Sequence, residues 1–274
     1  MSNIKFILFL VTPKSQFGRV LLLVLFLCFH FIGILGQEIE TTKGVYKTNF
    51  HAMPFTILKI GSNKPSANHT IPMLLFLHGA GERGNDNMTQ LKVGLPTLIN
   101  SILESRNACY IIIPQCPKDE KWVPTDWSKK YSSMDLCMSW PLASANELLD
   151  SIMKANKEID SNRIYVTGYS MGGFGCWEML QRFPSKFAAA IPICGGGDTL
   201  YAKSLIEIPI WAFHSKNDKL VPLNRTTDMG EIIAHYGNNF TMTIMENEGH
   251  FCWDKVYEDH AVVKWLFSKK RNDK

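Results

Sequence analysis

Three residues of the types that together activate a nucleophile occur in the chain in the order serine, acid, histidine: Ser170, Asp218 and His250. A serine hydroxyl attacks a carbonyl only when a base removes its proton, and an imidazole base works best when a carboxylate orients it. Each residue closely follows a predicted β-strand, at 164–167, 209–213 and 240–245. Loops that leave the carboxyl ends of parallel strands lie at one edge of the sheet, so the sequence predicts that these side chains converge for acyl transfer.

Ser170 lies in a G-x-S-x-G pentapeptide, Gly168 to Gly172. A short β-branched and aromatic run precedes it, and large side chains recur at helical spacing after it. Strand, glycine-flanked serine and helix form the context of a nucleophile elbow. Such a sharp turn leaves no room for side chains two residues to either side of the serine, which explains both glycines. A serine that only caps the helix is the alternative, and the surrounding pattern favours the nucleophile.

An acyl-transfer site also needs N–H donors for the oxyanion of the tetrahedral intermediate. The amide of Met171, at the start of the helix after the elbow, is the first expected donor. The loop that begins at His78, after a predicted strand at 71–77, supplies the second, with Ala80 preferred and Gly81 the alternative. We expect His78 to hold this loop by hydrogen bonds. Glu82 and Arg83 pair with each other, line the site or face solvent.

Other residues compete for the roles of acid and base. Asp198 follows three glycines at the end of a predicted strand, 188–193, and is the alternative acid. Asp218 itself could be an ordinary turn residue. His214 precedes the preferred acid in the same loop and is less suited as the base. The order and placement of Ser170, Asp218 and His250 favour these three residues over the alternatives.

Predicted strands and helices alternate from residue 71 to the end of the chain. The strands are expected at 71–77, 109–113, 164–167, 188–193, 209–213 and 240–245, and helices at 91–103, 142–158, 174–181, 226–236 and 255–268. An antiparallel pair over 43–60 is expected at the sheet edge. This pattern predicts an α/β fold, a mostly parallel, doubly wound sheet with antiparallel N-terminal strands. The fifteen residues between the strands at 188–193 and 209–213 are too few for a large cap domain.

Six stretches carry a resemblance to a known family: LLFLHGAGERGNDN (74–87), IIIPQCP (111–117), DSNRIYVTGYSMGGFGCW (160–177), FAAAIPICGGGD (187–198), IPIWAFHSKNDKLVP (208–222) and GHFCW (249–253). The chain resembles the α/β-hydrolase superfamily, and more closely bacterial predicted peptidases, phospholipase/carboxylesterase-like proteins and feruloyl esterases. The resemblance implies Ser170 as nucleophile, Asp218 as acid, His250 as base, and Ala80 and Met171 as oxyanion donors. Related dienelactone hydrolases use a cysteine nucleophile, so Ser170 argues against that activity. No cofactor or metal is implied.

The first 36 residues differ in character from the rest. Three basic residues are the only charges in this segment, and an almost wholly apolar run spans 20–35. This pattern predicts a secretory signal cleaved near Gly36, with an uncleaved membrane anchor as the alternative. We expect export to the periplasm or the medium, with 37–274 as a single catalytic domain. Membrane contact would then occur only through 20–35, if that run is retained.

Charge and cysteine content exclude other classes of protein. Without residues 1–36 the chain has 26 basic and 25 acidic residues, so nothing suggests a nucleic-acid partner. Six cysteines remain, enough for disulfides whose pairing the sequence does not fix. No C-x-x-C motif is present, so a structural zinc site is not expected. Cys176 and Cys194 are expected to be buried thiols.

Three tryptophans, Trp122, Trp127 and Trp140, lie in or next to a long predicted loop that ends at residue 141. They either stack on a sugar or an aromatic acid of the substrate, or pack the loop onto the domain. The sequence predicts a serine ester hydrolase acting on short-acyl or feruloyl esters, small or polysaccharide-linked. A serine peptidase and a catalytically idle binding module of the same fold are the alternatives.

Overall fold

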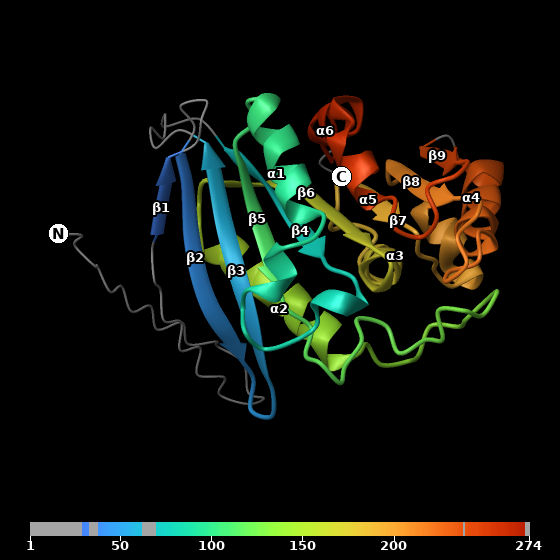
Figure 1. Cartoon of the computed structure of the whole chain (residues 1–274), viewed down its shortest axis with the longest axis horizontal. Coiled ribbons are helices and arrows are strands. Elements are labelled where there is room, and N and C mark those ends of the chain that lie inside the picture. The colour runs from blue at the N-terminus through green and yellow to red at the C-terminus, as the bar shows by residue number, and fades with distance from the viewer. Residues whose placement is uncertain (1–28, 33–37, 62–69, 238, 272–274) are drawn as a thin grey trace.

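In a computed structural model of the chain, the described residues are 29–32, 38–61, 70–237 and 239–271. They form one nine-stranded sheet with helices on both faces (Figure 1). Most of the predicted leader lies outside these residues. Its segment 29–32 forms a strand at the sheet edge, antiparallel to the strand that follows. Within the described part of the chain, no helix is both long enough and apolar enough to cross a membrane.

The sheet is antiparallel at its N-terminal side and parallel elsewhere. Its spatial order is β1-β2-β3-β5-β4-β6-β7-β8-β9, and every neighbouring pair from β5 to β9 is parallel. The mostly parallel sheet predicted from the sequence is confirmed. The strands are β1 (Phe29–Ile32), β2 (Glu38–Lys47), β3 (Ala52–Gly61), β4 (Ile71–Leu77), β5 (Cys109–Pro114), β6 (Ile159–Tyr169), β7 (Ala189–Ile193), β8 (Ile210–Ser215) and β9 (Phe240–Met245).

Each face of the sheet packs on its own set of helices, so there are two apolar cores. Helices α1, α5 and α6 cover one face and α2, α3 and α4 cover the other (Figure 1). This arrangement is the doubly wound architecture expected for a sheet buried on both sides. The helices are α1 (Leu95–Glu104), α2 (Trp140–Ala155), α3 (Met171–Arg182), α4 (Asn224–Tyr236), α5 (Trp253–Glu258) and α6 (His260–Phe267), with 3₁₀ helices η1 (Ala80–Glu82), η2 (Thr89–Leu91) and η3 (Thr199–Leu205).

Several elements differ from the prediction in their bounds, and two of the differences have a clear physical cause. The single helix expected at 255–268 is two helices, because the Asp259 carboxylate accepts a hydrogen bond of 2.8 Å from the Ala261 amide and starts α6 afresh. Strand β6 begins at Ile159, five residues earlier than expected. Its polar start stays at the surface, where Arg163 and Asp160 form a 2.8 Å ion pair.

No large cap domain covers the carboxyl ends of the described strands. The connection from β7 to β8 contains only η3, and the connection from β5 to α2 contains no helix or strand. This long segment is held against α3 and α4: Arg182 donates to the Asp135 and Leu136 carbonyls, and Arg225 donates to the Ser132 hydroxyl at 2.7 Å. These hydrogen bonds join the segment to α3 and α4.

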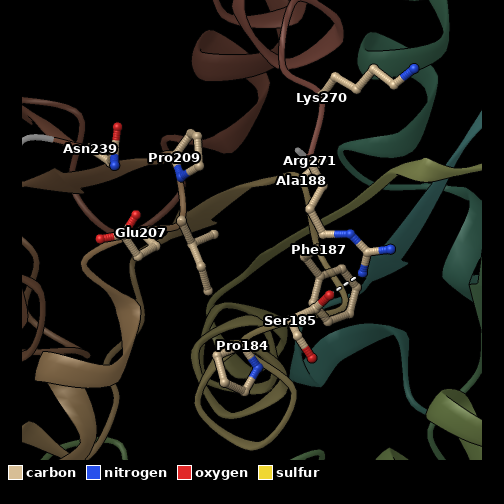
Figure 2. A pocket seen from close by; sticks show the side chains of 10 residues that line it. Pro184, Ser185, Phe187, Ala188, Glu207, Pro209, Asn239, Lys270 and Arg271 are labelled. Carbon is tan, nitrogen blue, oxygen red and sulfur yellow. Dashed lines mark hydrogen bonds between the residues drawn. The ribbon is translucent and has the colours of Figure 1, made fainter. Parts of the chain in front are cut away.

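A pocket of about 520 Å³ lies at the amino ends of the parallel strands, and we call it the amino-edge pocket (Figure 2). Residues that directly precede β7, β8 and β9 line it, among them Ala188, Pro209 and Asn239, together with Arg271 near the C-terminus. It lies at the opposite end of the sheet from the loops in which the sequence places the candidate catalytic residues.

Candidate active site

Ser170 sits on the sharp turn between β6 and α3. Its backbone dihedrals are φ 53° and ψ −121°, a region that non-glycine residues rarely occupy. Two backbone hydrogen bonds hold this conformation: the Ser170 amide donates to the Ile193 carbonyl at 2.9 Å, and the Phe174 amide donates to the Ser170 carbonyl at 3.1 Å. The strained turn exposes the hydroxyl at the carboxyl edge of the sheet.

The flanking glycines are required by the close approach of backbone atoms. A Cβ at Gly172 would lie 1.9 Å from the Leu77 carbonyl oxygen, and one at Gly168 would lie 2.5 Å from the Gly172 carbonyl oxygen. Real Cβ atoms do not come so near to other atoms. The steric reason predicted for both glycines is confirmed.

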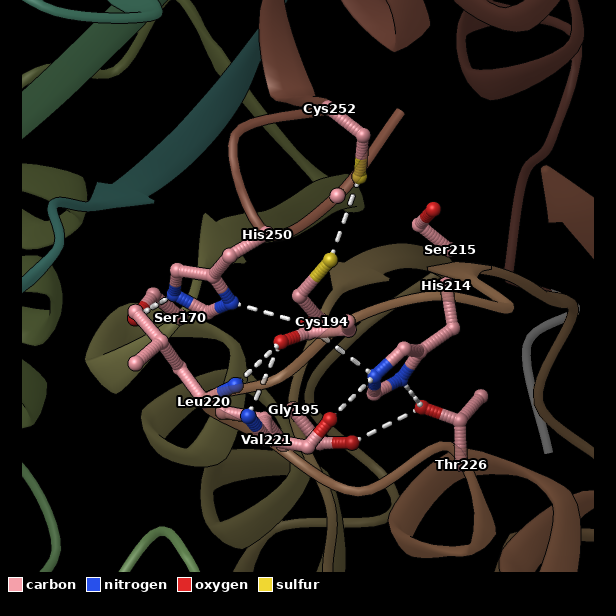
Figure 3. Close-up of polar contacts among 12 residues, drawn as sticks. Ser170, Cys194, Gly195, His214, Ser215, Leu220, Val221, Thr226, His250 and Cys252 are labelled. Atoms are coloured by element: carbon pink, nitrogen blue, oxygen red, sulfur yellow. Dashed lines mark hydrogen bonds and ion pairs between the residues drawn. The ribbon is translucent and has the colours of Figure 1, made fainter. Parts of the chain in front are cut away.

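The structure brings the predicted serine, histidine and acid into one hydrogen-bonded line (Figure 3). His250 Nε2 lies 2.8 Å from Ser170 Oγ, and His250 Nδ1 lies 2.7 Å from Asp218 Oδ2. A carboxylate only accepts, so Nδ1 carries the hydrogen and Nε2 is free to accept the serine proton. The imidazole is 8% exposed and is thereby shielded from bulk water. This is the arrangement that a general base needs.

Asp218 is held as a carboxylate. Its Oδ1 accepts the amides of Leu220 and Val221 at 2.8 and 2.9 Å, and its Oδ2 faces His250. Burial alone would raise the pKa of Asp218, but hydrogen bonds from His214, His250 and the two amides hold it well below its usual range. The negative charge is therefore present at neutral pH.

Asp198, the alternative acid, has structural partners instead. Its Oδ1 accepts the Leu200 amide at 3.0 Å and caps η3, and its Oδ2 accepts the Met134 amide at 2.8 Å. Asn217, which the sequence reasoning missed, ties the acid loop to the histidine loop by accepting the Gly249 amide at 2.8 Å. Its position directly before Asp218 is the signal that could have drawn attention to it.

The two expected oxyanion donors each start a helix near Ser170. Met171 follows Ser170 and is the first residue of α3, and Ala80 is the first residue of η1 and lines one pocket together with Ser170. Neither backbone amide donates a hydrogen bond within the described residues. Arg83 Nε donates to the Ala80 carbonyl at 2.9 Å and so holds the peptide between Ala80 and Gly81. The peptide that carries the Ala80 amide is held instead through its Gly79 carbonyl, which accepts from His78 Nδ1.

The side chains of Glu82 and His78 hold the loop that carries Ala80 by hydrogen bonds. Glu82 does not pair with Arg83: it is buried, its carboxylate accepts the Tyr169 hydroxyl at 2.9 Å, and burial raises its pKa. His78 Nδ1 donates to the Gly79 carbonyl at 2.7 Å, and its Nε2 accepts the Cys116 amide at 3.0 Å. Burial lowers the pKa of His78 to about 4, so the ring is neutral and structural, as the sequence predicted.

Ser170 opens into a second pocket, of about 480 Å³, which we call the serine pocket. Of the three predicted tryptophans only Trp127 lines it. Trp122 is fully buried, and its ring N–H donates to the His78 carbonyl at 3.0 Å at the start of the loop that carries Ala80. The expected substrate contact is therefore wrong for this residue. Trp140 lies outside the pocket and stacks on His51 at 4.2 Å.

Among the aromatic residues of the pocket that were not predicted are Phe251 and Trp253. They lie one and three residues after His250 in the sequence, and both line the serine pocket. Phe251 is 72% exposed at the mouth, whereas Trp253 stacks on Tyr169 at 4.3 Å. Their nearness to His250 in the chain was the available signal.

One set of potential metal ligands is found among the described residues, and it overlaps the acid loop. Cys194, His214 and Asp218 place donor atoms within 4.8 Å of one another. Each already has a partner: the thiol of Cys194 lies 3.1 Å from the thiol of Cys252, and both other side chains are hydrogen bonded. The six cysteines after residue 36 are all free thiols here, and Cys176 and Cys194 are buried as expected.

A family model for phospholipases and carboxylesterases matches residues 62–262. Two curated proteins are similar over shorter stretches. The poly(3-hydroxyalkanoate) depolymerase C of Paucimonas lemoignei is 28% identical over 136 residues, 46% of this chain and 28% of that protein. The bifunctional acetylxylan esterase/xylanase of Neocallimastix patriciarum is 30% identical over 161 residues, 55% of this chain and 20% of that protein. The matches thus span less than a third of either relative.

Solved structures agree on the fold. A thermostable esterase superposes with a TM-score of 0.75 at 27% identity, over 96% of this chain and 76% of that one. A ferulic acid esterase superposes with a TM-score of 0.62 over 84% of this chain and 99% of that one, but at 15% identity the likeness shows the fold alone. The matched family model, the sheet order and these superpositions agree: the chain belongs to the phospholipase/carboxylesterase family and has the α/β-hydrolase fold.

Proposed function

We propose that this chain is an exported serine esterase that cleaves short-acyl or feruloyl-type carboxylic esters, including polysaccharide-linked ones, through an acyl-enzyme at Ser170. The observation that carries the proposal is the line from Ser170 through His250 to Asp218, with contacts of 2.8 and 2.7 Å. Family membership supports ester hydrolysis. The similarity to an acetylxylan esterase and a polyester depolymerase favours a polymer-linked substrate.

The proposed mechanism has two steps. His250 Nε2 takes the hydroxyl proton as Ser170 Oγ attacks the ester carbonyl, whose electron pair moves onto oxygen and is held by the amides of Met171 and Ala80. Collapse of this intermediate breaks the bond to the alcohol, and His250 returns the proton to it. Water then repeats the cycle on the acyl-enzyme and frees Ser170. One oxyanion donor contributes about 2.7–4 kcal/mol in mutagenesis of other enzymes.

The shape of the serine pocket supports a small or flat acyl group. At about 480 Å³ it lies within the usual range for small-molecule sites, and its mouth carries the exposed apolar side chains of Phe251 and Leu220. Because no large cap is present among the described elements, a long acyl chain of a lipid would remain exposed to water when bound. A bulky alcohol such as a polysaccharide, in contrast, has free access to the serine pocket. Trp127 is the remaining candidate for stacking on it.

Two alternatives have less support. Acylaminoacyl peptidases superpose with TM-scores of 0.60 and 0.59 at 15% and 16% identity, which shows the common fold only. An idle binding module has no need for Ser170, His250 and Asp218 in hydrogen-bonding order.

The leader pattern over 1–36 supports export. Mass spectrometry of the protein secreted by a bacterial host tests it: cleavage near Gly36 is expected, and an intact chain in the membrane fraction would indicate an anchor.

The substrate test compares p-nitrophenyl acetate, butyrate and palmitate with methyl ferulate, acetylated xylan and a peptide p-nitroanilide. We expect turnover of the acetyl, butyryl and feruloyl esters and little turnover of the palmitate. A wild-type enzyme that cleaves the anilide faster than every ester would contradict the proposal and favour the peptidase. A folded enzyme that turns over none of these substrates would favour the binding module.

A further inference from the structure

Asp218 has a second histidine neighbour, on the side away from Ser170. His214 is fully buried at the end of β8, and its Nε2 lies 3.0 Å from the Val221 carbonyl oxygen and 3.4 Å from Asp218 Oδ2. His250 Nδ1 lies 2.7 Å from the same carboxylate oxygen, and Figure 3 shows both imidazole rings. The proposed mechanism gives this second imidazole no role.

The hydrogen bonds around His214 determine how many hydrogens the ring carries. Its Nδ1 lies 2.7 Å from Thr226 Oγ1, which also lies 2.8 Å from the Gly195 carbonyl oxygen. A hydroxyl has one hydrogen, and a carbonyl only accepts, so the Thr226 hydrogen belongs to the bond with Gly195. Nδ1 must then be the donor to Thr226. Nε2 must also be a donor, because it faces a carbonyl oxygen and a carboxylate oxygen.

A neutral ring would leave one of these contacts unsatisfied. If Thr226 donated to Nδ1 instead, its oxygen and the Gly195 carbonyl oxygen would lie 2.8 Å apart with no hydrogen between them. Both residues are buried, and buried acceptors that face each other without a hydrogen are costly. A ring with both hydrogens satisfies every contact.

We infer that His214 is an imidazolium, and that its positive charge positions Asp218 and weakens the attraction of this carboxylate for a proton on His250. The titratable groups that face His214 are Cys194 directly after β7, Asp218 from its own loop and, beyond Asp218, His250. The pKa of Cys194 is raised well above its usual value, first by its hydrogen bond with the Cys252 thiol and then by burial, so this thiol is neutral. Asp218 is therefore the anion that the imidazolium balances.

The charge has a consequence for catalysis, and this step rests on the proposed function. Asp218 favours a proton on His250, and a cation next to Asp218 offsets that effect. With His214 charged, Asp218 attracts the proton on His250 less strongly than an isolated carboxylate would. His214 is thus a positioning residue that acts through Asp218 and touches no substrate.

Nitrogen-15 NMR of the full chain with labelled histidine tests the charge without any substrate. The His214 resonances are assigned by their loss in His214→Gln. At pH 7 we expect the two ring nitrogens to have the nearly equal shifts of an imidazolium. One nitrogen with the strongly downfield shift of an unprotonated ring nitrogen would overturn the inference, whether or not the protein hydrolyses esters.

The pH profile of kcat/KM on p-nitrophenyl acetate tests the consequence. His214→Gln retains one donor without charge and should move the acid limb to higher pH by about one unit. Thr226→Val, which removes the Nδ1 acceptor, should move it in the same direction. Thr227→Val, one residue further along α4, should leave it in place. A lower melting temperature with an unmoved acid limb in both first variants would overturn the positioning role, and absent wild-type turnover would instead refute the proposed function.

Discussion

The serine pocket and the amino-edge pocket lie at opposite ends of the same parallel strands and have similar volumes, about 480 and 520 Å³. Ser170 lines the first pocket and Ser185 lines the second, and the polar groups around the two serines are used differently. At the carboxyl end, hydrogen bonds converge on Asp218 and His250 and leave Ser170 Oγ facing open space. At the amino end, Arg271 donates to main-chain oxygens of Ser185 and Ser161, and Figure 2 shows the first of these contacts.

The difference lies in what each set of hydrogen bonds holds in place. No histidine is among the described residues that line the amino-edge pocket, and its arginine joins the C-terminal segment to the start of β6. The serine pocket contains a strained serine, a buried base and a carboxylate held by two amides. Pocket volume alone therefore does not identify an active site in this fold.

The largest expected effect comes from the acid. Asp218→Asn should lower kcat by about 10⁴-fold, because the amide favours the wrong tautomer of His250, as in other serine triads. Steady-state kinetics on p-nitrophenyl acetate measures it. Asp198→Asn, which weakens the cap of η3, is the matched control and should change kcat less than threefold. Equal losses in the two variants would mean that the acid has been assigned wrongly.

Gly172→Ala should destabilise the fold by about 3 kcal/mol or more, because the new methyl group would lie 1.9 Å from the Leu77 carbonyl oxygen. Urea unfolding monitored by circular dichroism gives the change. Gly81→Ala is the control, since no atom lies within 4 Å of its added Cβ. Similar stabilities for the two variants would contradict the close backbone packing at the elbow.

Stability should depend on pH through His78, whose pKa is about 4 in the folded protein and about 6.5 when unfolded. Between these values the unfolded chain binds a proton that the native chain excludes. The free energy of unfolding should therefore decrease as pH falls from 6.5 to 4, by up to about 1.4 kcal/mol per pH unit. Urea titrations of wild type and His78→Gln isolate this contribution, and parallel pH curves would refute it.

Substitution of Arg83 should have a smaller effect on catalysis, and substitution of Arg271 should have none. Arg83→Met should lower kcat about tenfold with little change in KM, because the loop that supplies the Ala80 amide loses the 2.9 Å hydrogen bond from Arg83 to the Ala80 carbonyl. Arg271→Met at the amino-edge pocket should leave kcat unchanged and cost about 1 kcal/mol of stability. Steady-state kinetics and thermal unfolding of both variants measure these changes in kcat and stability. A lower kcat in Arg271→Met would contradict the conclusion that the amino-edge pocket takes no part in catalysis.

The sequence predicted the core of the site because the chemistry is tied to local motifs on successive strands. The glycines around Ser170 and the loops carrying Asp218 and His250 follow from strand order and sterics alone. The burial of Trp122 could not be predicted, because its partner, the His78 carbonyl, is 44 residues away. The proton on His214 likewise depends on Thr226 and Gly195, which only the folded sheet brings together.

The central claim is that Ser170, and no other serine, is the nucleophile. Its most direct test is labelling with a fluorophosphonate followed by peptide mass spectrometry, run with p-nitrophenyl acetate hydrolysis on wild type, Ser170→Ala and Ser185→Ala. We predict one labelled peptide containing Ser170 in wild type and in Ser185→Ala, both with full turnover, and neither label nor turnover in folded Ser170→Ala. Persistent turnover in Ser170→Ala, or a label on another residue, would contradict it.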